Sequence, residues 1–284
     1  MNELQAQVSK SFGSMLKSWR ATRKVNQLDL SLISDVSQRH VSFLESGRAR
    51  PSQPMVVQLS EALEVRLRDR NALLQAAGFA PYYRHRPLEA IEMAPVRDAL
   101  SRMLEHHARY PGIVIDREFN LMMENRPFTN LLGLFGAPQE LWQACCLNGA
   151  PPNLLGLIFH AQGARPFIKN FAEIAPLPLQ RAWRETLING GATHRFINEL
   201  RKDPTLPVTW HNPDPSSVPP PVMPLVIGRD DVSLSLFTMI ATFGTPHDVT
   251  TDEIRVEAFF PADDATESIL RELNARWRAD QELS

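Results

Sequence analysis

The stretch "SQRHVSFLESGRARPS" at residues 37–52 constrains the fold more than any other part of the chain. At 3.6 residues per turn, its first half forms a short helix with two different faces. One face can pack against neighbouring helices and carries His40, Val41 and Leu44. The opposite face carries hydrogen-bonding side chains and one aromatic ring, namely Gln38, Arg39, Ser42 and Phe43. A helix with this second face, followed at once by a basic turn, indicates a binding surface.

The polar face of this helix has the chemistry of a major-groove reader. Glutamine can pair bidentately with adenine and arginine with guanine, while an apolar group contacts the methyl group of thymine. The four side chains of this face are therefore candidate base-reading residues. Ser37 opens the helix, where free amides favour a phosphate, and Arg48 and Arg50 lie in the basic turn after it. These three residues are candidate phosphate ligands, which add affinity but no sequence information.

The distribution of charge agrees with a nucleic-acid partner for the first part of the chain. Residues 1–86 carry 13 lysines and arginines against 7 aspartates and glutamates, whereas the remaining residues carry 17 against 25. A small basic module joined to a larger acidic one favours a head that binds polyanions and a body that avoids them.

The first part of the chain, residues 12–79, is predicted to form a bundle of five short helices. Asn26 and Ser37 are suitable N-caps for the second and third helices, because their side chains can accept from the free amides of the first turn. Gly78 is a suitable stop for the fifth helix. A basic, aromatic and proline-containing segment, "FAPYYRHRP", follows. We therefore predict an all-α domain at residues 1–80, a linker at 81–95 and a second domain at 96–284.

The second part of the chain alternates short strand-like segments with helices. "GIVIDREFNLMMEN" predicts two strands around a charged turn, and the helix "PFTNLLG" follows it closely. Later, "VMPLVIG", "DVSLSLFTMIATF" and "IRVEAFF" predict three more strands before a final helix. Around Phe237, Met239 and Phe243 both faces of the strand become apolar, which predicts a cavity or a dimer interface on one side. The second domain is therefore predicted to be α+β with an antiparallel sheet.

Residues 12–78 resemble the xenobiotic-response-element type of helix-turn-helix domain, the fold of phage Cro and repressor proteins. The matching residues are Arg20, "NQLDL" (26–30), "VSQRHVSFLESG" (36–47) and "RARPS" (48–52). The resemblance implies a structural ion pair between Arg20 and Glu45. It also implies that Gln27 contacts a backbone phosphate and braces the first base-reading side chain. The family usually has glycine where this chain has Asp35, and aspartate tolerates a left-handed conformation better than most residues.

Over its full length the chain resembles the MmyB-like regulators, in which this helix-turn-helix precedes a PAS-like ligand-binding domain. The resemblance is carried by "AGFAPYY" (77–83) and "PGIVIDREFNLMMENRPFTNLLG" (111–133), whereas residues 142–233 do not match one by one. It implies that the second domain binds a small apolar molecule, with fatty acids as the favoured class.

Large apolar side chains and methionines are the candidate lining of the ligand pocket. Ligand pockets are mostly apolar, and methionine adapts to irregular guests. The candidates are Met123, Phe128, Leu132, Phe135, Trp142, Phe159, Phe167, Phe171, Phe196, Phe237, Met239 and Phe243. Each of them can equally belong to the hydrophobic core, so both interpretations stay open.

The sequence lacks the motifs of enzymatic and metal chemistry. It has no HExxH, GxSxG, Walker or GxGxxG motif, and its histidines have no partners at ligand spacing. The adjacent Cys145 and Cys146 cannot form a metal site alone. We therefore expect no catalytic residue, no metal and no required cofactor. The chain has no apolar run of about 18 residues and no apolar stretch of a signal peptide at its start, so we expect a cytoplasmic protein without a membrane partner.

The sequence thus predicts a transcription regulator that reads a double-stranded DNA operator and binds a small apolar ligand. We expect a homodimer, because one recognition helix reads only a few base pairs. The alternative is a protein-interaction or scaffold module whose helical bundle does not read DNA. In that case Arg48 and Arg50 belong to a solvated turn, and Phe43 contacts a partner helix or a dimer mate.

Overall fold

The computed structural model describes residues 11–146, 151–186, 191–206 and 222–282, with side chains described as far as residue 275. Contacts divide the chain into two compact units. The first consists of residues 1–90 together with 244–252, and the second of residues 91–243 and 253–284. The segment 244–252 lies within the sequence expected for the second domain but belongs to the first unit.

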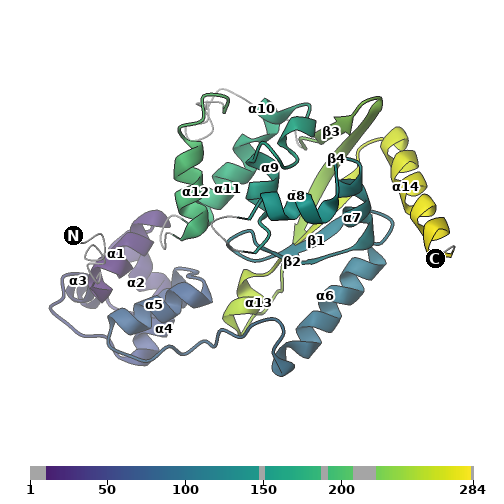
Figure 1. The fold of residues 1–284 in the computed structure, drawn as a ribbon. Coiled ribbons are helices and arrows are strands. Elements are labelled where there is room, and N and C mark those ends of the chain that lie inside the picture. The colour runs from purple at the N-terminus through teal and green to yellow at the C-terminus, as the bar shows by residue number, and fades with distance from the viewer. Residues whose placement is uncertain (1–10, 147–150, 187–190, 207–221, 283–284) are drawn as a thin grey trace, which may run out of the picture. The chain divides into compact units, whose positions relative to one another are not determined.

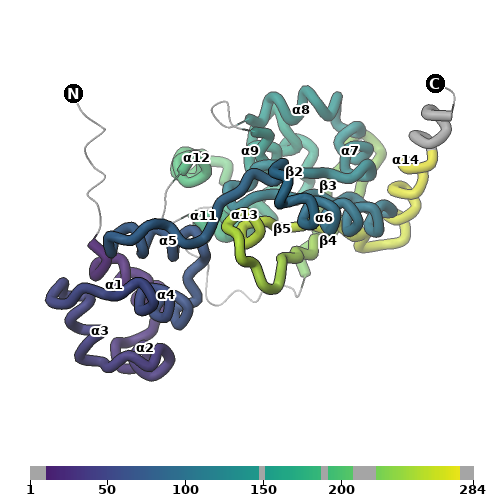
Figure 2. Tube along the Cα trace, turned by 90° about the horizontal axis from the view of Figure 1, so that it is seen from below, coloured from purple at the N-terminus to yellow at the C-terminus, as the bar shows by residue number. Residues whose placement is uncertain are grey.

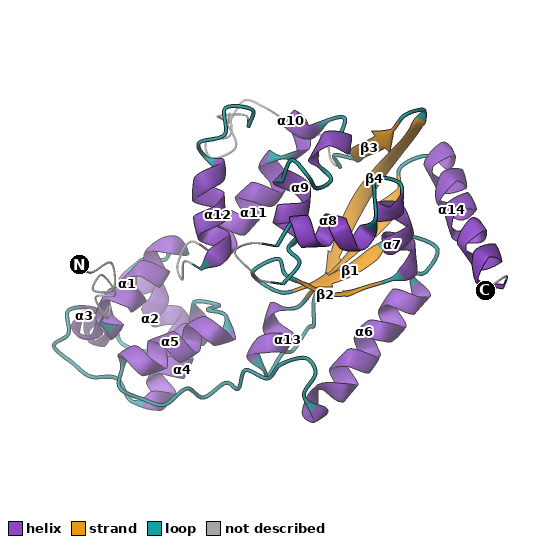
Figure 3. Cartoon of the chain, viewed as in Figure 1, coloured by secondary structure: helices purple, strands orange, loops and turns teal. Residues whose placement is uncertain are grey.

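The regular secondary structure in the described part of the first unit is all helical (Figure 3). Its bundle consists of α1 (Phe12–Thr22), α2 (Gln27–Ser34), α3 (Gln38–Glu45), α4 (Gln53–Ala62) and α5 (Leu67–Ala76). The core between these helices is built from aliphatic side chains such as Leu16, Leu30, Val41, Leu44 and Leu59, all of which are buried. This arrangement confirms the five-helix bundle predicted from the sequence.

The predicted ends of these helices are present. The side chain of Asn26 accepts a hydrogen bond from the amide of Asp29, and the side chain of Ser37 accepts one from the amide of His40. Gly78 follows the last helix with a φ of +90°, a left-handed conformation that glycine adopts without cost. Asp35 ends α2 with a φ of 50° and a ψ of 35°. A left-handed non-glycine residue costs roughly 1–2 kcal/mol, so the turn keeps the geometry of the motif at a small penalty.

The second unit combines a five-stranded sheet with helices (Figure 1). Its strands are β1 (Gly112–Ile115), β2 (Leu121–Glu124), β3 (Leu225–Arg229), β4 (Val232–Ala241) and β5 (Arg255–Pro261). Its helices begin with η2 (Ile91–Met93), α6 (Ala94–His106), α7 (Arg126–Gly133), α8 (Pro138–Ala144) and α9 (Leu154–Phe159). They continue with η3 (Arg165–Phe167), α10 (Phe171–Ile174), α11 (Pro176–Thr186), α12 (Ala192–Leu200) and α14 (Asp264–Glu282). The short helix α13 (Val249–Glu253) crosses the boundary between the two units.

The sheet is antiparallel with the strand order β2-β1-β5-β4-β3, which confirms the predicted PAS-like, antiparallel domain. Because side chains alternate along a strand, the sheet has two different faces. Thr238 and Phe259 are paired on the inner face, whereas Met239 and Ala258 are paired on the outer face. Helix α6 lies against the outer face (Figure 2). Its Met103 borders a groove on this face with Met239 and Ala258. Helices α7 to α11 gather over the inner face and enclose the core with it.

Candidate DNA-binding surface and ligand cavity

Helix α3 has the two faces that its sequence predicts. Val41 and Leu44 are buried in the bundle, whereas Gln38 and Arg39 are exposed. Ser42 and Phe43 are half-buried and lie on the same side as the two exposed residues. Arg48 and Arg50 in the following turn are exposed as well. The structure thus leaves the candidate base-reading residues and the two arginines of the turn wholly or partly exposed to solvent.

Phe43 is the centre of a small cluster of cations on this surface. The guanidinium carbon of Arg39 lies 5.3 Å from the centre of the Phe43 ring, and that of Arg48 lies 6.0 Å from it. Guanidinium groups within about 6 Å of an aromatic ring are attracted by its electron-rich face. Phe43 therefore holds together a candidate base-reading arginine and a candidate phosphate ligand.

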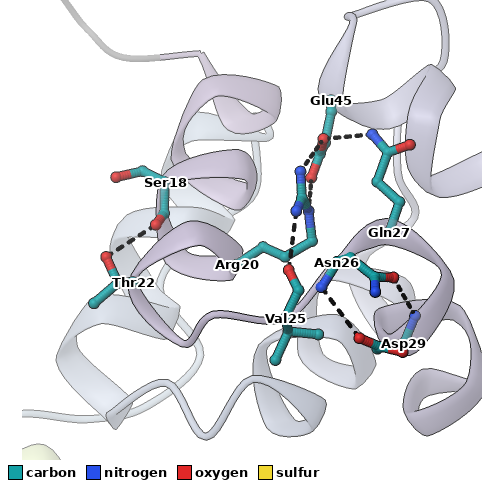
Figure 4. A network of polar contacts seen from close by, with 8 residues as sticks. All are labelled: Ser18, Arg20, Thr22, Val25, Asn26, Gln27, Asp29 and Glu45. Carbon is teal, nitrogen blue, oxygen red and sulfur yellow. Dashed lines mark hydrogen bonds and ion pairs between the residues drawn. The ribbon is translucent and has the colours of Figure 1, made fainter.

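A network of polar contacts fixes α3 against α1 and α2 (Figure 4). The guanidinium of Arg20 donates to both carboxylate oxygens of Glu45, at 2.7 and 3.1 Å, and to the carbonyl of Val25 at 2.9 Å. The side-chain amide of Gln27 donates to Glu45 at 2.7 Å. Burial alone would raise the pKa of Glu45, but these hydrogen bonds and the charge of Arg20 outweigh it and hold that pKa below its ordinary value. The pair implied by the family resemblance is therefore present.

The position of Gln27 leaves it available for a phosphate as well. Asn26 and Asp29 cap each other's amides, so that Gln27 becomes the first residue of α2 (Figure 4). A glutamine amide has two N–H donors, and only one of them is needed for the bond to Glu45. Ser37 uses its hydroxyl oxygen as an acceptor for the amide of His40, which leaves its own O–H to donate.

The second unit contains a cavity of about 460 Å³ between the inner face of the sheet and the helices. Strands β3, β4 and β5 form one wall, and α7, α9, α10 and α11 contribute most of the others. Apart from three residues, the described lining is apolar, with Leu132, Ile227 and Leu236 as typical members. Ligand pockets of proteins are of this kind, at roughly 300–1,000 Å³ with a few placed polar groups.

The three polar residues of the lining are Arg181, Thr238 and Glu257. A guanidinium nitrogen of Arg181 on α11 donates to Glu257 on β5 at 2.5 Å. The guanidinium carbon also lies 4.6 Å from the centre of the Phe119 ring. The Nε atom of Arg181 is buried and has no hydrogen-bond partner among the described residues. A buried donor of this kind costs free energy unless a partner accepts from it.

Three of the twelve candidate pocket residues line this cavity, namely Phe128, Leu132 and Phe135. The others lie elsewhere in the second unit. Trp142 stacks on Phe128, Phe167 stacks on Phe135, and Phe159 packs edge-on against Phe171. Met239 faces the groove on the outer side of the sheet, and Phe237 stacks on Phe260. Met123 lies on β2, Phe196 packs against the core from α12, and Phe243 lies just after β4.

Sequence reasoning missed the polar residues of the cavity. Arg181 and Glu257 are distant in the sequence, and neither belongs to a recognisable motif. The two groups meet only because α11 packs over β5, which pattern analysis of single segments does not reveal. The alternation of charged and apolar residues in "IRVEAFF" was the single available signal, because a glutamate at 257 falls on the same face as Phe259.

The described part of the chain offers neither clustered metal ligands nor a helix suited to cross a membrane. It contains no group of three or more histidine, cysteine, aspartate or glutamate residues that could hold a metal ion. None of its helices combines the length and the apolar character that a membrane span requires.

Comparisons with known proteins identify the family. A model described as "MmyB-like transcription regulator ligand binding domain" matches residues 96–273, and a model described as "Helix-turn-helix" matches residues 16–69. No curated protein matches the chain. Among solved structures, the chain is similar to "an RNA-binding Light-Oxygen-Voltage Receptor" at 13% identity and a TM-score of 0.27, covering 98% of this chain and 64% of that one. The chain thus spans less than two thirds of that receptor. With a helix-turn-helix before a ligand-binding domain that covers more than half of its length, the chain belongs to the MmyB-like, ligand-responsive transcription regulators.

Proposed function

We propose that this regulator reads a double-stranded DNA operator as a homodimer and that a fatty acid in the cavity controls its binding to DNA. The observation that carries the ligand class is the buried Nε donor of Arg181 in an otherwise apolar cavity of about 460 Å³. An acyl chain fits the apolar walls, and a carboxylate accepts from the guanidinium. A hydrogen bond to a charged group is worth roughly 1.5–3 kcal/mol, so one such anchor can select an acid among apolar molecules.

Glu257 tunes this anchor. Its carboxylate already accepts from Arg181, so a fatty-acid carboxylate at Nε is brought close to a second negative charge. Like charges that share one partner repel each other. We therefore expect Glu257→Gln to strengthen the binding of a fatty acid, whereas it leaves a neutral ligand with the same chain unaffected. Thr238, on the strand beside Glu257, supplies a further hydroxyl at this polar end.

Isothermal titration of the full-length protein with dodecanoate and with 1-dodecanol tests this assignment. Arg181→Gln is expected to weaken dodecanoate binding by about 10- to 150-fold, from the loss of one charged hydrogen bond. It changes dodecanol binding by less than about threefold, because dodecanol brings no charge to the site. Arg165→Gln is the matched control. Arg165 also pairs with a carboxylate, that of Asp203 at 2.8 Å, and also lies over an aromatic ring, that of Phe171, but is not in the described lining of the cavity.

Two results would contradict the assignment. The first is equal dodecanoate affinity in Arg181→Gln and the wild type. The second is equal weakening by Arg181→Gln and Arg165→Gln, because a general loss of stability would then explain both. Native mass spectrometry of the protein purified from its host gives an independent check, since a retained fatty acid adds its mass to that of the chain.

Selection of genomic fragments by the full-length protein tests the DNA proposal. Neutralisation of phosphates by Arg48 and Arg50 releases counterions, so affinity is expected to fall steeply with salt while one class of fragment stays enriched. If no fragment is enriched at moderate salt, the alternative of a protein-interaction module replaces the DNA-binding role.

The homodimer is proposed from the reading of half-sites, since two recognition helices multiply the discrimination of one. The side chain of Met239 on the outer face of the sheet is 59% exposed, which supports an interface on this face of the second unit. Light scattering on Met239→Glu tests this interface. A shift from dimer to monomer is expected, and a dimer that persists would place the interface elsewhere.

A further inference from the structure

The chain leaves the second unit between two strands that line the cavity and then returns to it. Strand β4 contributes Thr238 and Ile240 to the lining, and β5 contributes Glu257 and Phe259. The residues between these strands, 244–252, pack as part of the first unit. We call residues 244–252 the connector.

The connector is held in the first unit by specific hydrogen bonds. Asp248 forms an ion pair with Arg86 at 2.6 Å. The amide of Val249 donates to the carbonyl of Arg84 at 2.8 Å, and the hydroxyl of Thr250 donates to the carbonyl of Arg86. Asp248, Val249 and Thr250 are all buried. This burial and this bonding identify the connector as an integral part of the first unit.

The end of the connector caps a helix of the DNA-binding bundle. The carboxylate of Asp252 accepts from the amide of Leu67, the first residue of α5, at 3.1 Å. The residue in the N-cap position of α5 is Arg66, whose side chain makes no capping hydrogen bond. The first amides of a helix need acceptors, and a negative charge there also interacts favourably with the helix dipole. The connector therefore supplies a carboxylate acceptor to the first amide of α5.

The residue after Asp252 is held in the second unit. Glu253 lies 3.7 Å from Arg117, and both side chains are less than 10% exposed. Arg117 also donates to the carbonyl of Glu185 at the end of α11, the helix that carries Arg181. Two neighbouring residues of α13 thus bond within different units. Asp252 bonds to α5 in the first unit, and Glu253 pairs with Arg117, which bonds to α11 in the second.

We infer that the connector transmits occupancy of the cavity to the DNA-binding unit, and that Asp252 and Asp248 are its positioning residues. A ligand that displaces β4, β5 or α11 also displaces Glu253 at the end of α13. This displacement changes the hydrogen bond by which Asp252 caps α5. The ligand has an effect only if its affinity differs between two states of the protein, one in which the connector is bonded to the first unit and one in which these bonds are broken. This inference rests on the proposed function, because it takes the cavity as the ligand site.

Hydrogen exchange of the full-length protein, with and without saturating dodecanoate, tests the inference at the first turn of α5. The connector variant is Asp248→Asn with Asp252→Asn. The matched control is Asp230→Asn with Asp231→Asn, which makes the same change of charge in the exposed turn between β3 and β4. Titration calorimetry on the same samples measures dodecanoate affinity.

In the wild type and the control, dodecanoate is expected to change the exchange rates at the first turn of α5 by at least about fivefold, the lower end of typical couplings between sites. In the connector variant the change falls below about twofold, while dodecanoate affinity stays within about twofold of the wild type. A connector variant that responds like the wild type would overturn the inference, and so would a wild type that binds dodecanoate without any change at α5. Loss of two carboxylates can also lower the stability of the first unit, so a second variant exchanges the ion pair, Arg86→Asp with Asp248→Arg. Dodecanoate is expected to change the exchange rates at α5 in this double variant but not in Arg86→Asp alone.

A failure of the ligand class is distinguishable from a failure of the connector. If the wild type does not bind dodecanoate, the fatty-acid proposal is wrong. The role of the connector is then tested with substitutions that fill the cavity in place of a ligand. Ala164→Phe, with Leu157→Phe as the second choice, places a ring among the lining residues. The same fivefold change at α5 is expected in either variant and is lost when the connector substitutions are added. Cavity-filling variants without any change at α5 would overturn the inference.

Discussion

Replacement of Arg20 by methionine tests whether the recognition helix is held by its buried ion pair. The substitution removes two hydrogen bonds to Glu45 and one to the carbonyl of Val25. It leaves the carboxylate of Glu45, whose side chain is 5% exposed, with the amide of Gln27 as its one remaining hydrogen-bond partner among the described residues. Breaking a buried ion pair on one side costs about 3–5 kcal/mol. Since the side chain of Arg20 is itself 15% exposed, we expect a cost near the lower limit, about 3 kcal/mol.

The double variant Arg20→Met with Glu45→Gln separates the charge from the packing. It leaves no buried charge, and a glutamine at position 45 can still bond to Gln27, so its cost is expected to be about 1 kcal/mol. Hydrogen exchange of the amides in α1 and α3 of the full-length protein measures the local free energy of opening. In thermal unfolding the single variant is expected to lower the midpoint of the first unit by roughly 10–20 °C.

The reasoning would be refuted by a double variant that is as unstable as Arg20→Met alone. Such a result would mean that the methylene stem of Arg20, rather than the charge left on Glu45, carries the stability. A single variant that costs less than about 1 kcal/mol would refute it too, because an exposed pair has that value.

The remaining predictions concern DNA reading and pH. Arg39→Ala is expected to relax base preference by about 1–3 kcal/mol at one operator position, whereas Arg50→Ala weakens all sequences alike and lowers the salt slope by about one; fluorescence anisotropy on matched and mutated operators distinguishes them. Phe43→Ala removes the ring that lies beside Arg39 and, if the proposed operator reading is right, an apolar contact to thymine. It should then weaken binding mainly at A·T positions and relax the position assigned to Arg39, whereas loss of dimerisation in light scattering would assign Phe43 to a dimer mate. Because the pKa of Glu45 is held below its ordinary value of 4.5, the stability it contributes is complete above that pH and is lost as the pH falls through the folded-state pKa. Glu45→Gln should therefore show a shallower loss of stability in acid, followed by circular dichroism, and an unchanged acid profile would contradict this assignment.

Local features of the first unit could be predicted from the sequence because their causes are local. Asn26 caps α2 through an amide only three residues away, and the two faces of α3 follow from helical geometry alone. Asp35 was interpretable because few residues tolerate a left-handed turn. The pair of Arg20 and Glu45 spans 25 residues and came from the family resemblance, not from spacing.

Burial on α2 was harder to predict from spacing. Leu28, Leu30, Leu32 and Ile33 all fit a helical pattern, but only Leu30 is buried, whereas the other three are 50%, 73% and 57% exposed. Periodicity says which residues share a face of a helix, but the neighbouring helices decide how wide the buried face is. The cavity was hidden for a related reason. Aromatic and methionine residues are abundant throughout the second unit, and whether one lines the cavity or fills the core depends on how α7 to α11 pack over the sheet.

The connector was not visible in the sequence at all, and its place in the fold limits how regulation can work. Helix α3 is fixed within its unit, because α1 and α3 touch through their backbones: a Cβ atom on Gly13 would lie 2.4 Å from the carbonyl oxygen of Leu44. The hydrogen bonds of Glu45 with Arg20 on α1 and Gln27 on α2 further stabilise the position of α3 in the bundle. A ligand signal therefore has little freedom to rearrange the base-reading residues relative to the bundle. Helix α5 is the opposite case, since Asp252 of the connector caps its first turn. Regulation through α5 changes the stability or the placement of the whole DNA-binding bundle and leaves its reading surface intact, so a ligand is expected to alter affinity for all operator sequences rather than the choice among them.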